Sequence, residues 1–63
     1  MKMIAKNVTR DVVNEFESQL SAVCRTSSSN TKTVTYHYYA GDDEVARVTY
    51  NYNSKLYNIR MAD

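Results

Sequence analysis

Residues 31–62 read TKTVTYHYYA GDDEVARVTY NYNSKLYNIR MA, and this stretch decides the fold of the chain. Three runs rich in the strand-forming residues Thr, Val, Tyr and Ile occupy 31–40, 44–52 and 56–62. Polar turn sequences, Gly41-Asp42-Asp43 and Asn53-Ser54, separate the runs. Because two short turns join three such runs, we predict an antiparallel β-meander.

The alternation of side chains along these runs predicts the register and two distinct faces. A three-residue first turn and a two-residue second turn place Tyr36 opposite Val48 and Val48 opposite Ile59, so that apolar residues share one side. This side, the inner face, would carry Val34, Tyr36, Tyr38, Ala46, Val48, Tyr50, Tyr57, Ile59 and Met61. The outer face would carry Thr33, Thr35, His37, Tyr39, Val45, Arg47, Thr49, Asn51, Leu56, Asn58 and Arg60, with no acidic residue.

A helical period precedes the strands, from Thr9 to Arg25. Its apolar stripe consists of Val12, Phe16, Leu20 and Val23, with Val13 and Cys24 at the edge of the stripe. The polar run at 26–30 then predicts a loop. We therefore expect an α+β fold of element order α-β-β-β in a single domain, 1–63, with one N-terminal helix packed on the inner face of a three-stranded antiparallel meander. The segment Met1–Lys6 is either a further edge strand or a frayed terminus.

Composition narrows the class of protein further. The chain has 63 residues with one Gly, one Cys, no Pro and a net charge of +1. No apolar run approaches the roughly 18 residues of a membrane span, and the N-terminus lacks the pattern of a signal peptide, so we expect a cytoplasmic protein without membrane contact. A single cysteine forms no internal disulfide and, with one His, no recognisable metal site. Cys24 would be buried on the helix, or else a partly exposed thiol.

Candidate catalytic residues are few, and we expect no enzyme and no cofactor. The one nucleophile–base pair that the composition suggests is Cys24 with His37. In the predicted fold Cys24 belongs to the helix side of the sheet and His37 to the outer face, so the sheet separates them. A single Gly leaves no glycine-rich loop for a phosphate.

The outer face is the predicted binding surface. Two arginines and a histidine in one row, without an acid, would attract an acidic protein partner, and Tyr and Arg are enriched at binding hot spots. The predicted site consists of His37, Tyr39, Arg47, Thr49, Asn58 and Arg60. An alternative partner for the same residues is nucleic acid, for which a net charge of +1 is low. The run 31–40, expected at the edge of the sheet, would offer its backbone to a second copy of the chain.

The chain is a small single domain with polar segments such as Tyr50-Asn51-Tyr52-Asn53-Ser54-Lys55, and in this it resembles the accessory proteins of T-even-like tailed phages. This resemblance implies a non-enzymatic inhibitor or modulator that binds a protein of the host in the host cytoplasm. The order of elements is also similar to the first part of a double-stranded RNA-binding domain.

Overall fold

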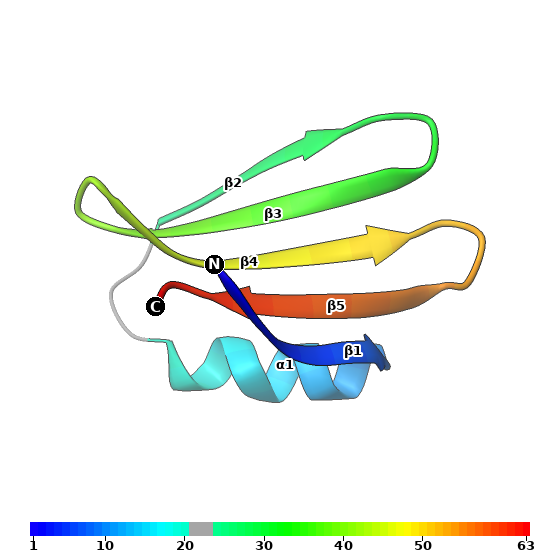
Figure 1. Ribbon diagram of the computed structural model, residues 1–63, viewed down its shortest axis with the longest axis horizontal. Coiled ribbons are helices and arrows are strands. Elements are labelled where there is room, and N and C mark those ends of the chain that lie inside the picture. Colours follow the sequence, from blue (N-terminus) through cyan, green and yellow to red (C-terminus); the bar gives the residue numbers. More distant parts are fainter. Residues whose placement is uncertain (21–23) are drawn as a thin grey trace.

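A computed structural model of the chain describes residues 1–20 and 24–63 and shows an α+β fold (Figure 1). One helix and five strands follow one another as β1 (Lys2–Val8), α1 (Arg10–Gln19), β2 (Cys24–Ser29), β3 (Thr33–Ala40), β4 (Asp43–Asn51) and β5 (Leu56–Met61). The strands form one antiparallel sheet of order β1-β5-β4-β3-β2. The sheet therefore has two strands more than the predicted meander, one at each edge.

The meander itself is confirmed in β3, β4 and β5, although its first turn holds two residues and not the predicted three, because Asp43 pairs with Ala40. Tyr36 lies opposite Val48, and Val48 lies opposite Ile59, as the alternation predicts. The turn after β4 is longer than expected, because β4 ends at Asn51 and β5 begins at Leu56. The backbone N–H of Lys55 donates to the carbonyl of Asn51 (2.8 Å) and closes that turn.

The segment 24–29 is the main error of the sequence-based prediction. It was expected to end the helix and begin a loop, but it forms β2 and pairs with β3 over six residues without interruption. Consequently 31–40 is an interior segment of the sheet, and the edge strands are β1 and β2. Cys24, expected on the helix, is an exposed strand residue. Of the two alternatives for the N-terminal segment, an edge strand and a frayed terminus, the structure has the strand, because β1 pairs with β5.

The helix α1 is shorter than its apolar period. It begins after Thr9, whose side chain forms no capping hydrogen bond, and it ends at Gln19, because Leu20 is already extended (φ −87°, ψ 120°). Val23, the last member of the predicted stripe, lies outside the described residues. On the helix it is Val13, with 5% of its surface exposed, that is buried, whereas Val12 is 42% exposed. The face that meets the sheet is thus shifted from the centre of the predicted stripe toward Val13 at its edge.

The core lies between α1 and the inner face of the sheet. Its buried members are Val13, Tyr38, Ala46, Val48 and Ile59. Phe16 and Leu20, which we expected to be buried, are partly buried and pack against this cluster. In the described part of the chain no helix is long and apolar enough to cross a membrane.

Candidate binding face of the sheet

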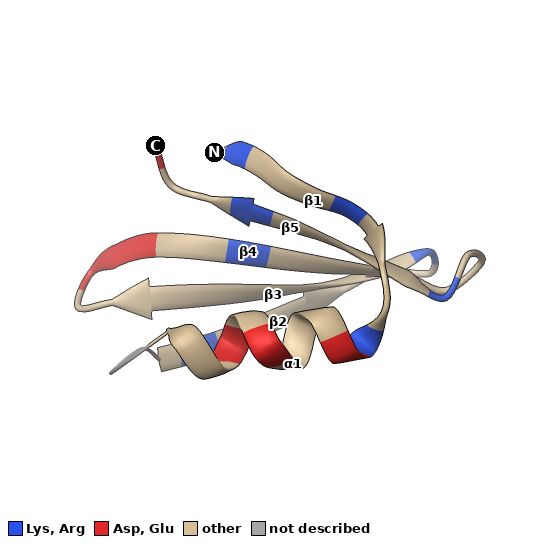
Figure 2. Cartoon of the chain, turned by 90° about the horizontal axis from the view of Figure 1, so that it is seen from below, with Lys and Arg blue, Asp and Glu red and all other residues tan. Residues whose placement is uncertain are grey.

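The outer face of the sheet is the side opposite α1, and in residues 1–20 and 24–63 no helix covers it (Figure 2). The six predicted site residues do share this side: His37 and Tyr39 from β3, Arg47 and Thr49 from β4, Asn58 and Arg60 from β5. His37, Arg47 and Arg60 form one row across the three strands. This is the arrangement that the predicted register implied.

A β-bulge changes the charge of this face. Tyr38 lies opposite Ala46, but Tyr39 lies opposite Glu44, so β4 holds one extra residue, Val45, at this point. A bulge of this kind places two residues of one strand against one of the other and breaks the alternation of sides. Val45 packs against the core, and Glu44 takes the outer position that the sequence assigned to Val45.

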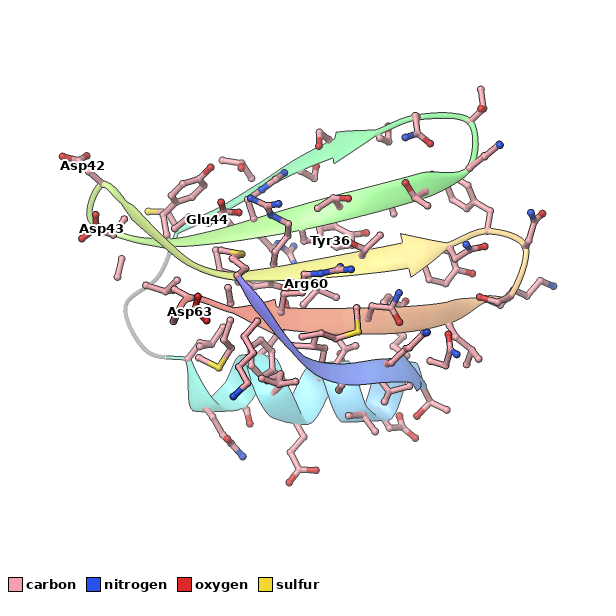
Figure 3. All side chains as sticks on the ribbon, viewed as in Figure 1. Tyr36, Asp42, Asp43, Glu44, Arg60 and Asp63 are labelled. Carbon is pink, nitrogen blue, oxygen red and sulfur yellow. The ribbon has the colours of Figure 1, made fainter. Side chains whose placement is uncertain are left out.

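Glu44 therefore overturns the expectation of a face without an acid. Its Oε2 lies 2.6 Å from Nδ1 of His37 and accepts a hydrogen bond from Nε of Arg47 at 3.0 Å. Its Oε1 accepts from Nη2 of Arg47 at 2.7 Å, so the arginine binds both oxygens. Figure 3 shows Glu44 lying over β3, whereas Asp42 and Asp43 project from the tip of the hairpin. We call Glu44, His37 and Arg47 the outer cluster.

The contacts in the outer cluster shift the acid–base balance of its members. Hydrogen bonding from Arg47, aided by His37, lowers the pKa of Glu44 to about 2, against the opposing effect of its partial burial. The same bond raises the pKa of Arg47 above its ordinary value. The cluster thus fixes a carboxylate and a guanidinium in one geometry, with 19% of the Glu44 side chain exposed.

Arg60 differs from Arg47 although the two lie opposite each other. Among the described residues Arg60 forms no ion pair, while Arg47 is held by Glu44. Thr49 and Asn58, the adjacent pair in the next row, are also engaged. The Thr49 hydroxyl lies 3.5 Å from that of Thr35, and Oδ1 of Asn58 accepts a hydrogen bond from the Asn7 N–H at 2.9 Å. Arg60 is consequently the arginine of this row that is open to an outside partner.

The structure also places a hydroxyl beside His37 that sequence reasoning missed. Oγ of Ser28 lies 3.3 Å from Nε2 of His37, whose Nδ1 contacts Glu44, so the three follow the nucleophile–base–carboxylate order of hydrolases. The prediction that the sheet separates Cys24 from His37 is also wrong. Cys24 lies opposite Tyr39 and so faces the same side as His37. Only recognition of β2 as a strand could have revealed either neighbour.

Catalysis by that arrangement would also need a substrate pocket and donors for an oxyanion. Two hollows in the described surface lie elsewhere, and neither is lined by Ser28 or His37. One is bounded by α1, β2 and β3, and the other lies between β1 and α1.

A second polar cluster ties the helix to the sheet on the inner face. The Tyr38 hydroxyl donates to Oε2 of Glu17 at 2.6 Å, and Nη1 of Arg25 donates to the same oxygen at 3.1 Å. Burial, followed by this hydrogen bond, raises the pKa of Tyr38. The Arg25 guanidinium also lies over the Tyr36 ring, 5.3 Å from its centre. These contacts hold β2 and β3 against α1 and are structural.

The described residues contain no group of three His, Cys, Asp or Glu side chains that could hold a metal ion.

Comparison of the chain with protein-family models, curated proteins and solved structures gives no match. The geometry of the outer face is therefore what a functional assignment rests on.

Proposed function

We propose that this chain is a non-enzymatic module that binds another protein through the outer face of its sheet. The observation that carries the proposal is the contrast along one row, in which Arg47 is fixed by Glu44 while Arg60 has no acidic partner among the described residues. A carboxylate on the partner would pair with Arg60. In the setting that the phage resemblance implies, the partner is a host protein that is blocked or redirected by stoichiometric binding.

Protein is favoured over nucleic acid as the partner because the bulge brings Glu44 onto the face, where it neutralises the charge of Arg47. A nucleic-acid site gains its affinity from several phosphate contacts and from aromatic rings on which bases stack. On this face Arg47 is neutralised by Glu44, and the tyrosines other than Tyr39 belong to the inner face or the turns. A preformed polar cluster beside one open arginine suits a protein surface, where charge complementarity gives specificity.

The experiment that tests the proposal compares two single substitutions of arginine. The parent chain, immobilised, is used to capture and identify a partner from nuclease-treated lysate of the host cell, and the affinity for that purified partner is then measured. Arg60→Ser should weaken binding by at least about 2 kcal/mol if Arg60 is a hot spot. Arg10→Ser, on the exposed start of α1, is the matched control and should leave the affinity unchanged.

Three results would contradict the proposal. Equal affinities of the parent and Arg60→Ser would show that the outer face is a solvated surface. Loss of all captured material on nuclease treatment would indicate nucleic acid instead. So would an affinity that falls steeply and linearly with the logarithm of the salt concentration, because a contact of one arginine depends only weakly on salt.

A further inference from the structure

The free edge of β2 is unusually open for the edge of a sheet. All six of its residues are exposed, and they pair with β3 in an unbroken register. The strand reads CRTSSS, with small polar side chains and one charge. That charge, on Arg25, is bound by Glu17 and lies over Tyr36, so it turns back toward its own chain. Nothing on the strand itself opposes the approach of another strand.

The opposite edge, β1, carries the features that usually protect an edge. Its pairing with β5 is interrupted by two register shifts, and it bears Lys2 and Lys6. Near its end Asn7 adopts a left-handed conformation (φ 56°). Bulges and lysines of this kind discourage pairing with another chain. The sheet thus has one protected edge and one unprotected edge.

The backbone groups that β2 presents outward follow from the ladder. The N–H of Asn30 donates to the carbonyl of Thr33 (2.9 Å) across the turn between β2 and β3. Backbone groups in an antiparallel pair point alternately toward and away from the partner strand. Counting back from Asn30, those of Ser28 and Thr26 point to β3, and those of Arg25, Ser27 and Ser29 point away from the sheet.

We propose that β2 is a homodimer interface, at which β2 of a second copy pairs antiparallel about a two-fold axis at Ser27. In this register Ser27 lies opposite Ser27 of the second copy, and Arg25 lies opposite Ser29. All three outward-pointing residues of each strand then form ladder pairs, which makes six inter-chain hydrogen bonds. A register centred on Thr26 would form four within β2, so the arrangement centred on Ser27 is preferred.

The side chains of this register are compatible with the pairing. The two copies of Arg25 stand four residues apart along the ladder, about 14 Å at the rise of a strand. That separation exceeds the Debye length of about 8 Å at physiological salt, so their repulsion is screened. Within β2 the other pairs join Ser27 with Ser27 and Thr26 with Ser28, whose hydroxyls can hydrogen-bond across strands, and Cys24 lies opposite Asn30. A sheet of ten strands results, and a chain with a core of five buried residues gains further ordered backbone.

The dimer does not depend on the function proposed for the outer face. A two-fold axis perpendicular to the sheet keeps both outer faces on one side, where they form a continuous surface with two copies of Arg60. Loss of the dimer and loss of partner binding are therefore separable, since one depends on Ser27 and the other on Arg60.

The first test measures the mass of the intact chain by sedimentation equilibrium over a series of concentrations. The parent should approach twice 7.3 kDa as its concentration rises. Ser27→Pro removes an outward N–H, which edge strands tolerate, and should weaken the dimer at least about tenfold. Ser27→Ala keeps the N–H and should leave the association constant unchanged. Circular dichroism verifies that each variant is folded.

The second test asks whether the two strands meet at Ser27. In a Cys24→Ser background, Ser27→Cys places two thiols opposite each other on residues about 5.5 Å apart between Cα atoms, within the range of a disulfide. Mild oxidation should cross-link this variant, while Ser54→Cys, in the turn after β4, should remain a monomer on denaturing gels. A parent that stays monomeric at high micromolar concentration overturns the proposal. So does a dimer that is insensitive to Ser27→Pro and does not cross-link at position 27, because it would then use another surface.

Discussion

At the scale of single residues, Glu44 has the largest effect on the character of the outer face. Without it, His37, Arg47 and Arg60 would form a row of positive charge, which is what the sequence predicts. With it, the face contains a fixed ion pair and one open arginine. The signal that could have revealed this is the order of Glu44 and Val45. An apolar residue packs on the core more favourably than a carboxylate, and a bulge satisfies both side chains at once.

Replacement of Glu44 by Gln should lower stability in a pH-dependent way. The pKa of Glu44 is lowered to about 2 in the folded state, so its stabilising contribution is fully present above its ordinary value and is lost as the pH falls toward 2. At pH 7 Glu44→Gln should reduce the free energy of unfolding by about 1–2 kcal/mol, allowing for screening by solvent. Urea unfolding between pH 7 and pH 2 should show the difference from the parent narrowing below about pH 4.5. The matched control, Asp42→Asn at the exposed hairpin tip, should have the same free energy of unfolding as the parent at pH 7. If Glu44→Gln also has the parent's value, the outer cluster does not stabilise the fold.

At the scale of elements, the parts of the fold that could be predicted are those with long-range regularity. The register of β3, β4 and β5 follows from strict alternation, because a slip by one residue would move Val48 and Ile59 to the solvent side. β2 lacks such alternation. It buries no side chain, so its sequence records only that small polar residues are tolerated at an edge. Its stability comes from backbone pairing with β3, which no local pattern reveals.

The helix shows why the candidate core was only partly correct. Periodicity identifies an apolar stripe but not which part of it the sheet covers. The predicted stripe has Val12 at its centre and Val13 at its edge, yet Val13 is buried and Val12 is exposed. Leu20, also in the stripe, packs on the core from an extended segment after the helix. The six candidate site residues were placed correctly on one side, since they depend on β3, β4 and β5 alone. Ser28 and Glu44, their neighbours, depend on β2 and on the bulge.

Two valines on α1 test this shift of the buried face. Val13→Ala should cost about 2 kcal/mol of unfolding free energy, because it removes buried methyl groups from the core. Val12→Ala should change stability by less than about 0.5 kcal/mol, since that side chain is largely exposed and Ala favours a helix. Chemical denaturation of both variants provides the comparison. Equal losses of unfolding free energy, or a larger loss for Val12→Ala, would show that the helix packs on the sheet through the centre of the predicted stripe, at Val12.

At the scale of the whole molecule, one hydrogen-bonded cluster joins three elements. Glu17 of α1 accepts hydrogen bonds from Tyr38 of β3 and Arg25 of β2. Among the described residues these two bonds are the side-chain hydrogen bonds that connect α1 with the sheet. The global stability should therefore respond to the protonation of Tyr38.

Alkaline pH should destabilise the domain through Tyr38. Its pKa is raised on folding by burial and by the bond to Glu17, so its contribution is fully present below the ordinary value of 10.0 and is lost as the pH rises beyond it. Melting temperatures between pH 8 and pH 11.5 should fall for the parent. Tyr38→Phe should start lower by the loss of one hydrogen bond, about 1 kcal/mol, and then fall less steeply. Tyr52→Phe, at an exposed turn, is the control and should follow the parent. Parallel plots of melting temperature against pH for all three proteins would show that Tyr38 does not cause the alkaline destabilisation.

The extra residue in β4 has a consequence for insertions and deletions in this hairpin. Removing Val45 would straighten the strand and still leave Glu44 opposite Tyr39. Removing Asp42 would leave too few residues for the turn, so the ladder would advance by one position and carry Glu44 to the side of the helix. Two deletions three positions apart would thus preserve or abolish the same ion pair. The charge pattern of the surface is encoded by the length of a hairpin as much as by the residues in it, and natural length variants at this hairpin would differ in the partners they accept.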